Sequence, residues 1–160
     1  MVSYWIFIVK DHLHMGRIIL ARDVLFDRVR NKFWSLNSRS RNVKKIKPGD
    51  HVLFYITSRD ERGLMGRGVI STDPHPITPE QRFHVIGTPS EAFDYAVDFS
   101  EAEIWDRVIP IEELENKISI LTGKKSSKVV FRGSVIRISK NDYQTVLEIK
   151  RSKEASVKSS

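Results

Sequence analysis

The chain has 160 residues, 40% of them hydrophobic, no cysteine and a formal net charge of +7. This length fits a single domain with one core. The lack of cysteine excludes disulfides, thiol nucleophiles and thiolate metal sites. No apolar run approaches the roughly 18 residues of a membrane-spanning helix, and the first residues lead directly into a strand-like segment instead of a signal peptide. These features predict a cytoplasmic protein without a membrane partner.

The basic residues gather in two segments that contain no acid. Residues 28–47 hold eight lysines or arginines and residues 124–137 hold five more, whereas residues 91–115 hold nine acids against one arginine. An ordinary solvated surface mixes the two signs of charge. The two acid-free segments therefore favour one positive face directed at a polyanion, with chance surface charge as the alternative.

Residues 4–9 (Y-W-I-F-I-V) predict the first strand. This strand is apolar on both faces, which is typical of a central position in a sheet. Asp11 follows it and belongs to the residue types that cap a helix start. Apolar side chains at helical spacing then predict a helix within residues 12–30.

A central β-hairpin is predicted in the middle of the chain. Residues 47–50 (K-P-G-D) form a turn sequence, because proline fixes φ and glycine permits a positive φ. Residues 52–56 are rich in β-branched and aromatic side chains, and residues 65–71 return as the second strand. Gly66 and Gly68 lie within this second strand. They indicate a bulge, a barrel corner or the close approach of another backbone or a ligand.

An aromatic pair, Phe33 and Trp34, lies within a polar, basic stretch over residues 31–42, which we expect to be a surface loop. Phe33 is predicted to fill the core. Trp34 has two interpretations: it also fills the core, or it offers an indole face on which a base stacks while nearby lysines and arginines bind phosphates.

The second half of the chain begins with a long irregular connection over residues 72–90, which has Phe83 in its middle. Residues 103–109 predict a strand with Trp105 on its more polar face, where it either lines a pocket or covers the hairpin. The remaining predicted elements are a helix over 111–114, strands over 129–131 and 135–138, a helix over 140–149 capped by Ser139, and a disordered basic tail over 150–160. The predicted domain therefore spans residues 1–149.

Motifs of catalysis and metal binding are missing. His12 and His14 are two residues apart, a spacing that does not place both on one helix face. The chain contains no P-loop, no H-E-x-x-H and no G-x-S-x-G sequence. The glycines around Gly66 lie in a hairpin, whereas a dinucleotide fingerprint lies between a strand and a helix. We therefore predict no catalytic residue, no metal site and no cofactor.

Five segments in this order resemble the EVE family of the PUA-like superfamily. They are Y-W-I-F from Tyr4, F-W-S-L from Phe33, K-P-G-D-H-V-L-F-Y from Lys47, G-R-G-V from Gly66, and F-R-G-S-V-I-R-I-S from Phe131 leading to Asp142-Tyr143. The resemblance covers residues 4–149. It implies a mixed α/β fold, a PUA-like pseudobarrel of five or six strands with flanking helices.

EVE domains are also similar to YTH domains, which read methylated adenine in RNA. In that family a strand ends in Lys-Ser, and a Trp-Ser dipeptide follows the first helix. Lys10-Asp11 and Trp34-Ser35 stand in those places here, and Asp11 departs from the pattern. The resemblance implies that Trp34 is one wall of an aromatic cage, that Ser35 contacts the base edge and that Lys10 touches phosphate.

The sequence therefore predicts a non-catalytic, monomeric nucleic-acid-binding module that takes a modified base of DNA or RNA into an aromatic pocket. The expected pocket residues are Trp34, Ser35, Asn37, Phe83 and Trp105. The expected phosphate-binding residues are Lys10, Arg39, Arg41, Lys44, Lys45 and Arg132. Two alternatives stay open: an RNA-binding component of RNA modification or processing, and an ASCH-like hydrolase of modified nucleosides that uses Lys10, Thr57 and Glu103.

Overall fold

The computed structural model describes residues 2–85, 93–121 and 134–159. Its elements in chain order are β1 (Tyr4–Lys10), β2 (His12–His14), β3 (Arg17–Ile19), α1 (Ala21–Arg30), β4 (Phe33–Leu36), η1 (Val43–Lys45), β5 (His51–Thr57), β6 (Arg62–Ile70), β7 (His75–Pro76), α2 (Pro79–Arg82), β8 (Tyr95–Pro110), α3 (Ile111–Leu114), η2 (Ser119–Leu121), β9 (Val135–Ile138) and α5 (Lys140–Ser159). Among these elements, no helix has the length and apolarity that crossing a membrane requires.

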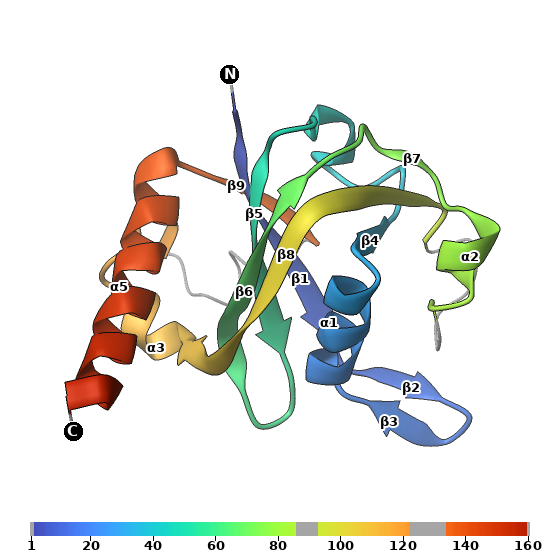
Figure 1. Cartoon of the computed structure of the whole chain (residues 1–160). Coiled ribbons are helices and arrows are strands. Elements are labelled where there is room, and N and C mark those ends of the chain that lie inside the picture. The colour runs from blue at the N-terminus through green and yellow to red at the C-terminus, as the bar shows by residue number, and fades with distance from the viewer. Residues whose placement is uncertain (1, 86–92, 122–133, 160) are drawn as a thin grey trace.

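One curled, mixed sheet forms the body of the molecule (Figure 1). Its strands follow the order β4-β8-β6-β5-β1-β9, and the short β7 pairs with β8. β1 is parallel to β5, and every other pairing in this sheet is antiparallel. The predicted hairpin of β5 and β6 is at the centre of this order, and β1 is an inner strand, so both predictions are confirmed.

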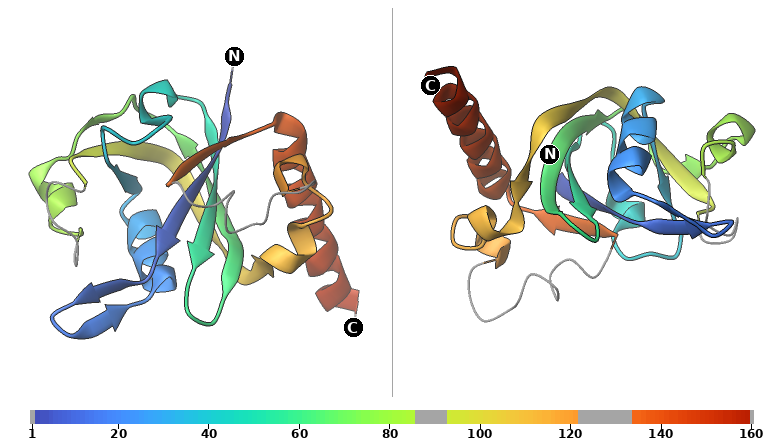
Figure 2. Two further views of the ribbon diagram at one scale, coloured as in Figure 1. Left: turned by 180° about the vertical axis from the view of Figure 1, so that it is seen from behind. Right: turned by 90° about the horizontal axis from the view of Figure 1, so that it is seen from below.

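The two faces of the sheet have separate hydrophobic cores, because successive side chains of a strand point to opposite faces. Trp5 and Phe7 of β1 belong to the cluster on the α1 side of the sheet, which we call the inner cluster. Ile6 and Ile8 of β1 belong to the cluster on the side of α3 and α5, which we call the outer cluster. Figure 1 and Figure 2 show α1 on one side of the curled sheet and α3 and α5 on the other.

The predicted turn before β5 is closed by its own residues. The backbone N–H of Asp50 donates to the carbonyl of Lys47 at 3.1 Å, and Gly49 has a φ of +91°. The buried Asp50 carboxylate accepts hydrogen bonds from the Trp5 indole N–H at 2.8 Å and from the Ser3 backbone N–H at 2.9 Å. This network ties the turn to the start of β1.

Gly66 is required by the packing of two strands. A Cβ atom on Gly66 would lie 2.4 Å from the carbonyl oxygen of Glu103 on β8, and the register of β6 with β8 shifts beside it. The predicted close approach of backbones is therefore confirmed at this position.

The predicted helix within residues 12–30 is confirmed as α1 (Ala21–Arg30), whereas residues 12–19 form a β-hairpin that the sequence did not predict. The hairpin of β2 and β3 pairs His12 with Ile19 and is a separate two-stranded sheet. Met15 and Gly16 have positive φ values of 51° and 78°, which suit a two-residue hairpin turn and not a helix. The N-cap residue of α1 is Leu20, not Asp11, but the Asp11 Oδ1 accepts the N–H of Ala21, the first residue of α1, at 2.7 Å from ten residues earlier in the chain.

The prediction of a surface loop over residues 31–42 is wrong at its aromatic pair. Phe33 to Leu36 form β4, which pairs with β8 in the register Trp34 to Val97. Phe33 is 1% exposed, which confirms its expected place in the core. Three apolar residues in a four-residue strand give too short a pattern to detect among polar neighbours.

The C-terminal helix also differs from expectation. Ser139 caps it as predicted, because its hydroxyl accepts the N–H of Asp142 at 3.0 Å. However, α5 continues to Ser159, where the sequence predicted an end at residue 149 and a disordered tail. Lys150 pairs with Glu154 at 2.9 Å one turn later, and the Lys150 Nζ lies 5.6 Å from the Trp105 ring centroid. These contacts of a charged side chain stabilise α5 beyond residue 149, where the sequence shows no apolar stripe at helical spacing.

The middle connection contains more structure than predicted. Within residues 72–90 the chain forms β7 and then α2, which Thr78 and Gln81 begin with a capping box. The predicted strand over 103–109 is the second half of the longer β8, and the predicted helix over 111–114 is confirmed as α3. The predicted strand over 129–131 lies outside the described residues.

Candidate functional site

A cavity of about 230 Å³ lies where the end of β1 meets α1 and β4. β1 contributes Ile8, Val9 and Lys10, α1 contributes Val24 and Arg28, β4 contributes Trp34 and Ser35, and the remaining lining residues are His12, Phe93 and Ser134. The structure thus brings together three of the predicted site residues, namely Lys10, Trp34 and Ser35. An engineered apolar cavity of about 150 Å³ accommodates benzene, so this cavity has room for a single substituted base.

Trp34 is both a core residue and a wall of this cavity. Only 5% of it is exposed, and its ring is stacked on Phe54 with centroids 5.1 Å apart and planes 7° from parallel. The Phe7 ring lies 5.6 Å away at a tilted angle. Phe54 occupies one face of the indole, so the cavity is bounded by the other face or the ring edge. The two interpretations of Trp34 are therefore compatible.

Arg28 places a buried positive charge in the cavity wall. Only 5% of Arg28 is exposed, and its guanidinium donates to Asp27 Oδ2 at 2.7 Å and to the His84 carbonyl oxygen at 3.1 Å. It also lies 5.0 Å from the Phe33 ring centroid. Burial lowers the pKa of Arg28, and the neighbouring Asp27 charge opposes this shift. The guanidinium remains charged, because its ordinary pKa is far above neutrality.

Ser35 and Lys10, for which the resemblance predicts contacts with the base edge and with phosphate, both line this cavity. Ser35 is 8% exposed and is opposite Ala96 in the pairing of β4 with β8. Lys10 is the exposed last residue of β1. A buried hydroxyl and an exposed ammonium on one cavity suit a ligand that has a polar edge inside and an anionic group outside.

A second, wider cavity of about 820 Å³ follows β4 along the chain. It is lined by Ser38, Arg39, Ser40, Asn42, Val43, Lys44, Lys45, Lys47, Asp73, Pro74 and Tyr95. Ser38 is three residues beyond Ser35 and follows the end of β4 at Leu36, so at most roughly 10 Å of chain separates the two cavities. Three of the predicted phosphate-binding residues, Arg39, Lys44 and Lys45, thus lie together in a basic hollow beside the first cavity.

Asp94 holds the loop that carries this basic hollow. Its carboxylate accepts the Ser38 backbone N–H at 2.8 Å and the Ser38 hydroxyl. These two hydrogen bonds lower the pKa of Asp94, so the carboxylate is ionised at neutral pH and the anchor is at full strength. Arg41 is exposed on the same loop but does not line the cavity. Arg132 lies outside the described residues.

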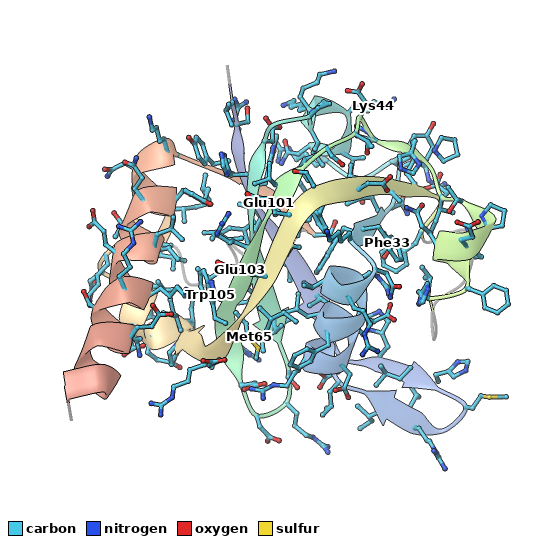
Figure 3. All side chains as sticks on the ribbon, in the orientation of Figure 1. Phe33, Lys44, Met65, Glu101, Glu103 and Trp105 are labelled. Atoms are coloured by element: carbon cyan, nitrogen blue, oxygen red, sulfur yellow. The ribbon has the colours of Figure 1, made fainter. Side chains whose placement is uncertain are left out.

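The structure places the other predicted pocket residues elsewhere. Trp105 packs into the outer cluster on the opposite face of the sheet from Trp34, and its indole N–H donates to Glu103 Oε1 at 3.3 Å. Figure 3 shows Trp105 on the α5 side of the sheet, away from Phe33 beside α1. Phe83 is 86% exposed at the end of α2 and does not line the cavity. Asn37 accepts the Arg39 backbone N–H at 2.8 Å within the following turn.

The hydrolase constellation is only partly assembled. Lys10 and Thr57 are direct partners in the pairing of β1 with β5. Glu103, however, pairs with Arg67 at 3.0 Å, and Arg67 is opposite Leu53 on β5. Leu53 is four residues before Thr57, or roughly 13 Å along the strand. The described residues also contain no group of three or more His, Asp or Glu side chains placed to hold a metal ion.

Sequence reasoning missed seven residues that line the cavity: Ile8, Val9, His12, Val24, Arg28, Phe93 and Ser134. For Arg28 a signal exists. The buried positions of α1 are Ala21, Leu25 and Arg28, which are four and then three residues apart. This spacing defines one helix face, so an arginine on the apolar stripe was a candidate for a buried functional charge.

The curled mixed sheet, with a small cavity beside a basic hollow, defines a PUA-like domain. The EVE domain family model matches residues 3–149. The chain therefore belongs to the EVE domain family, and the resemblance drawn from the sequence motifs is confirmed.

The chain is also similar to one curated relative and to solved structures, and the structures agree with this fold. A UPF0310 protein of Pyrococcus abyssi is 23% identical over 152 residues, covering 91% of this chain and 97% of the relative. The structure of human THYN1 protein in complex with 5-methylcytosine-containing DNA has a TM-score of 0.62 and 19% identity, covering 92% of this chain and 97% of that one. The YTH domain of Zygosaccharomyces rouxii MRB1 in complex with N6-methyladenosine RNA has a TM-score of 0.57 and 10% identity, covering 94% and 90%.

Proposed function

We propose that this EVE domain binds nucleic acid and takes one modified base into the cavity beside Trp34. The observation that carries the proposal is that two cavities of different character lie next to each other along the chain. One is a small, aromatic-walled cavity, and the other is a basic hollow about three residues away along the chain. A base fits the first, and the phosphates of its strand fit the second.

The cavity has the chemistry that a base needs. Trp34 offers indole surface, Ser35 a hydroxyl, and Arg28 a charged donor group at the cavity wall. A base that leaves its stack loses a few kcal/mol, and stacking on one aromatic side chain returns roughly 1–3 kcal/mol. Hydrogen bonds to the base edge are stronger in such a partly buried site than in bulk water, because the local dielectric is lower.

The charges outside the cavity fit a polyanion. Arg39, Lys44 and Lys45 are exposed in the basic hollow, and Lys10 is exposed at the rim of the base cavity. Such side chains contact phosphates and position the strand without reading its sequence. The two similar structures whose ligands are a methylated DNA and a methylated RNA support a methylated base as the ligand class.

Selectivity for a methyl group is expected to be modest. Burial of one methyl group contributes about 0.8 kcal/mol, which corresponds to about fourfold in affinity. A larger ratio requires that the modification fills the cavity closely. The alternative function, a component of RNA modification or processing, predicts tighter binding to RNA than to DNA oligonucleotides. Comparison of RNA and DNA probes therefore distinguishes it from a reader of modified DNA.

The test is a binding panel on the purified chain, followed by a variant that fills the cavity. Fluorescence anisotropy with short DNA containing 5-methylcytosine, short RNA containing N6-methyladenosine and the unmodified strands should give at least one modified strand a severalfold advantage. Val24→Phe places a phenyl ring in the cavity from a half-buried position. This change should abolish the advantage and leave the phosphate contacts in place.

Val2→Phe is the matched control, because Val2 is 49% exposed and precedes β1 at the end remote from the cavity. This control should bind like the parent chain. Equal affinity of the parent chain for modified and unmodified strands would refute base recognition. Absence of binding to every strand would refute the function as a whole.

A further inference from the structure

The β2–β3 hairpin carries large apolar side chains that are exposed to solvent. Met15 at its tip is 90% exposed, Leu13 is 68% exposed and Ile18 is 52% exposed. The hairpin projects from the body of the molecule beyond α1 (Figure 1, Figure 2). A two-stranded hairpin on its own is only marginally stable in water, so this element needs an anchor at its base.

Asp11 anchors the hairpin at both of its ends. Its Oδ1 accepts the N–H of Ala21, the first residue of α1 and the second residue after β3, at 2.7 Å. Its Oδ2 accepts the Ser58 hydroxyl at 3.0 Å and the Arg59 N–H at 3.2 Å from the β5–β6 loop. Asp11 is the residue that departs from the Lys-Ser pattern of the related family. Its carboxylate is used to fix the hairpin to the sheet.

The hairpin is continuous with the base cavity and has the charge that nucleic acid attracts. His12, its first residue, lines the cavity, and His12 Nδ1 lies 2.6 Å from the Lys10 carbonyl oxygen. Residues 12–20 contain Arg17 and two histidines but no acid. An acid-free surface with an arginine, next to the cavity, suits a face directed at phosphates.

We propose that the β2–β3 hairpin is a wedge that enters duplex nucleic acid and places Met15 in the gap left by the flipped base. The inference rests on the proposed function of the cavity and adds the substrate class, a modified base within a duplex. Apolar side chains such as Met and Leu separate base steps in this way in other proteins. The wedge offsets part of the unstacking cost that a buried target base imposes.

The dimensions of the hairpin fit this role. β2 rises about 3.3 Å per residue, so Met15 lies roughly 10 Å from His12 at the cavity wall. The major groove of B-form DNA is about 12 Å wide and admits a two-stranded β-ribbon. A base that swings out of the stack beside Met15 therefore has the cavity within reach.

The test compares Met15→Asn with Met15→Leu in the full chain. Met15 has a φ of +51° and Gly16 a φ of +78°, and Asn-Gly is the favoured sequence for such a turn. Met15→Asn thus keeps or strengthens the hairpin and removes the apolar wedge. Met15→Leu keeps an apolar side chain, and Val2→Ala serves as a control at an exposed apolar site remote from the hairpin.

The probes are DNA with one central 5-methylcytosine and RNA with one central N6-methyladenosine, each as a single strand, as a paired duplex and as a duplex mismatched at the modified base. We expect Met15→Asn to lose about tenfold or more in affinity for the paired duplex and less than twofold for the single strand. The mismatch should recover part of this loss, since unpairing a mismatched base costs least. Met15→Leu and Val2→Ala should behave like the parent chain.

Other outcomes overturn the inference in distinguishable ways. If the parent chain binds modified single strands but no duplex, the wedge is refuted and the cavity function stands. The wedge is also refuted if Met15→Asn weakens binding to single strands and duplexes equally. It is refuted as well if Met15→Asn weakens binding to neither. If light scattering finds a dimer that Met15→Asn dissociates while duplex affinity is unchanged, the hairpin binds a second copy of the chain instead. Failure of every probe refutes the cavity function itself.

Discussion

Replacement of Trp34 by alanine should lower both the thermal stability of the domain and its affinity for a modified oligonucleotide. The burial and contacts of Trp34 indicate the size of each effect. Trp34 is 5% exposed and stacked on Phe54 at 5.1 Å. Truncation of a buried tryptophan to alanine costs about 3–5 kcal/mol. For a domain of this size each kcal/mol lowers Tm by roughly 2–4 °C, so Trp34→Ala should lower Tm by about 6–20 °C.

Trp34→Phe separates the two roles, because it keeps a ring against Phe54. We expect a smaller cost of about 1–2 kcal/mol, since less apolar area is removed from the core. Binding is measured at low temperature, where circular dichroism establishes that each variant is folded. Loss of one stacking partner for a base corresponds to roughly 1–3 kcal/mol, or about 5- to 150-fold in affinity. Trp34→Ala should show this loss and Trp34→Phe a fraction of it.

Fluorescence supplies the direct readout. A modified oligonucleotide that stacks against Trp34 should quench part of the emission, and this quenching should vanish in Trp34→Phe, where Trp5 and Trp105 remain. A Tm within about 2 °C of the parent for Trp34→Ala would contradict the burial of this side chain. Unchanged quenching and unchanged affinity in both variants would remove Trp34 from the binding site and leave it as a core residue only.

Three further predictions address the surroundings of the cavity. Affinity for single strands should fall with a log–log salt slope of about −0.7 per phosphate contacted, and Lys44→Gln with Lys45→Gln should make the slope shallower without changing base preference. Asp11→Asn should speed proteolysis within the β2–β3 hairpin. Burial tends to raise the pKa of Asp11, but its hydrogen bonds lower it overall, so the anchor should be stable at neutral pH and weaken only as pH falls below the ordinary aspartate pKa of about 3.9. Deletion of residues 150–160 should lower Tm by a few degrees at most in a thermal melt, because the lost Lys150 contact with Trp105 and the Lys153 ion pair with Glu113 are near the surface.

Local sequence was sufficient for the elements whose pattern is strong over several residues. The continuous apolar run of β1 predicted an inner strand, because only a strand covered on both faces leaves no polar side chain. The K-P-G-D turn and the glycines of β6 predicted the central hairpin, since each depends on the conformation of a few adjacent residues. The ordered family motifs predicted the fold class and placed Trp34 and Ser35 at one site, and both residues line the same cavity.

Tertiary structure decided which of the predicted side chains meet. Trp34 and Trp105 are both buried aromatics, but the sheet lies between their clusters, and no local pattern records which face of a curled sheet a residue will occupy. Arg28 became a cavity residue because α1 packs against β1 and β4, whose partners are distant in the chain. The β2–β3 hairpin depends on the Asp11 carboxylate reaching Ala21 and Ser58, and contacts across 10 and 47 residues of chain are set by packing, which the periodicity of a short segment does not encode.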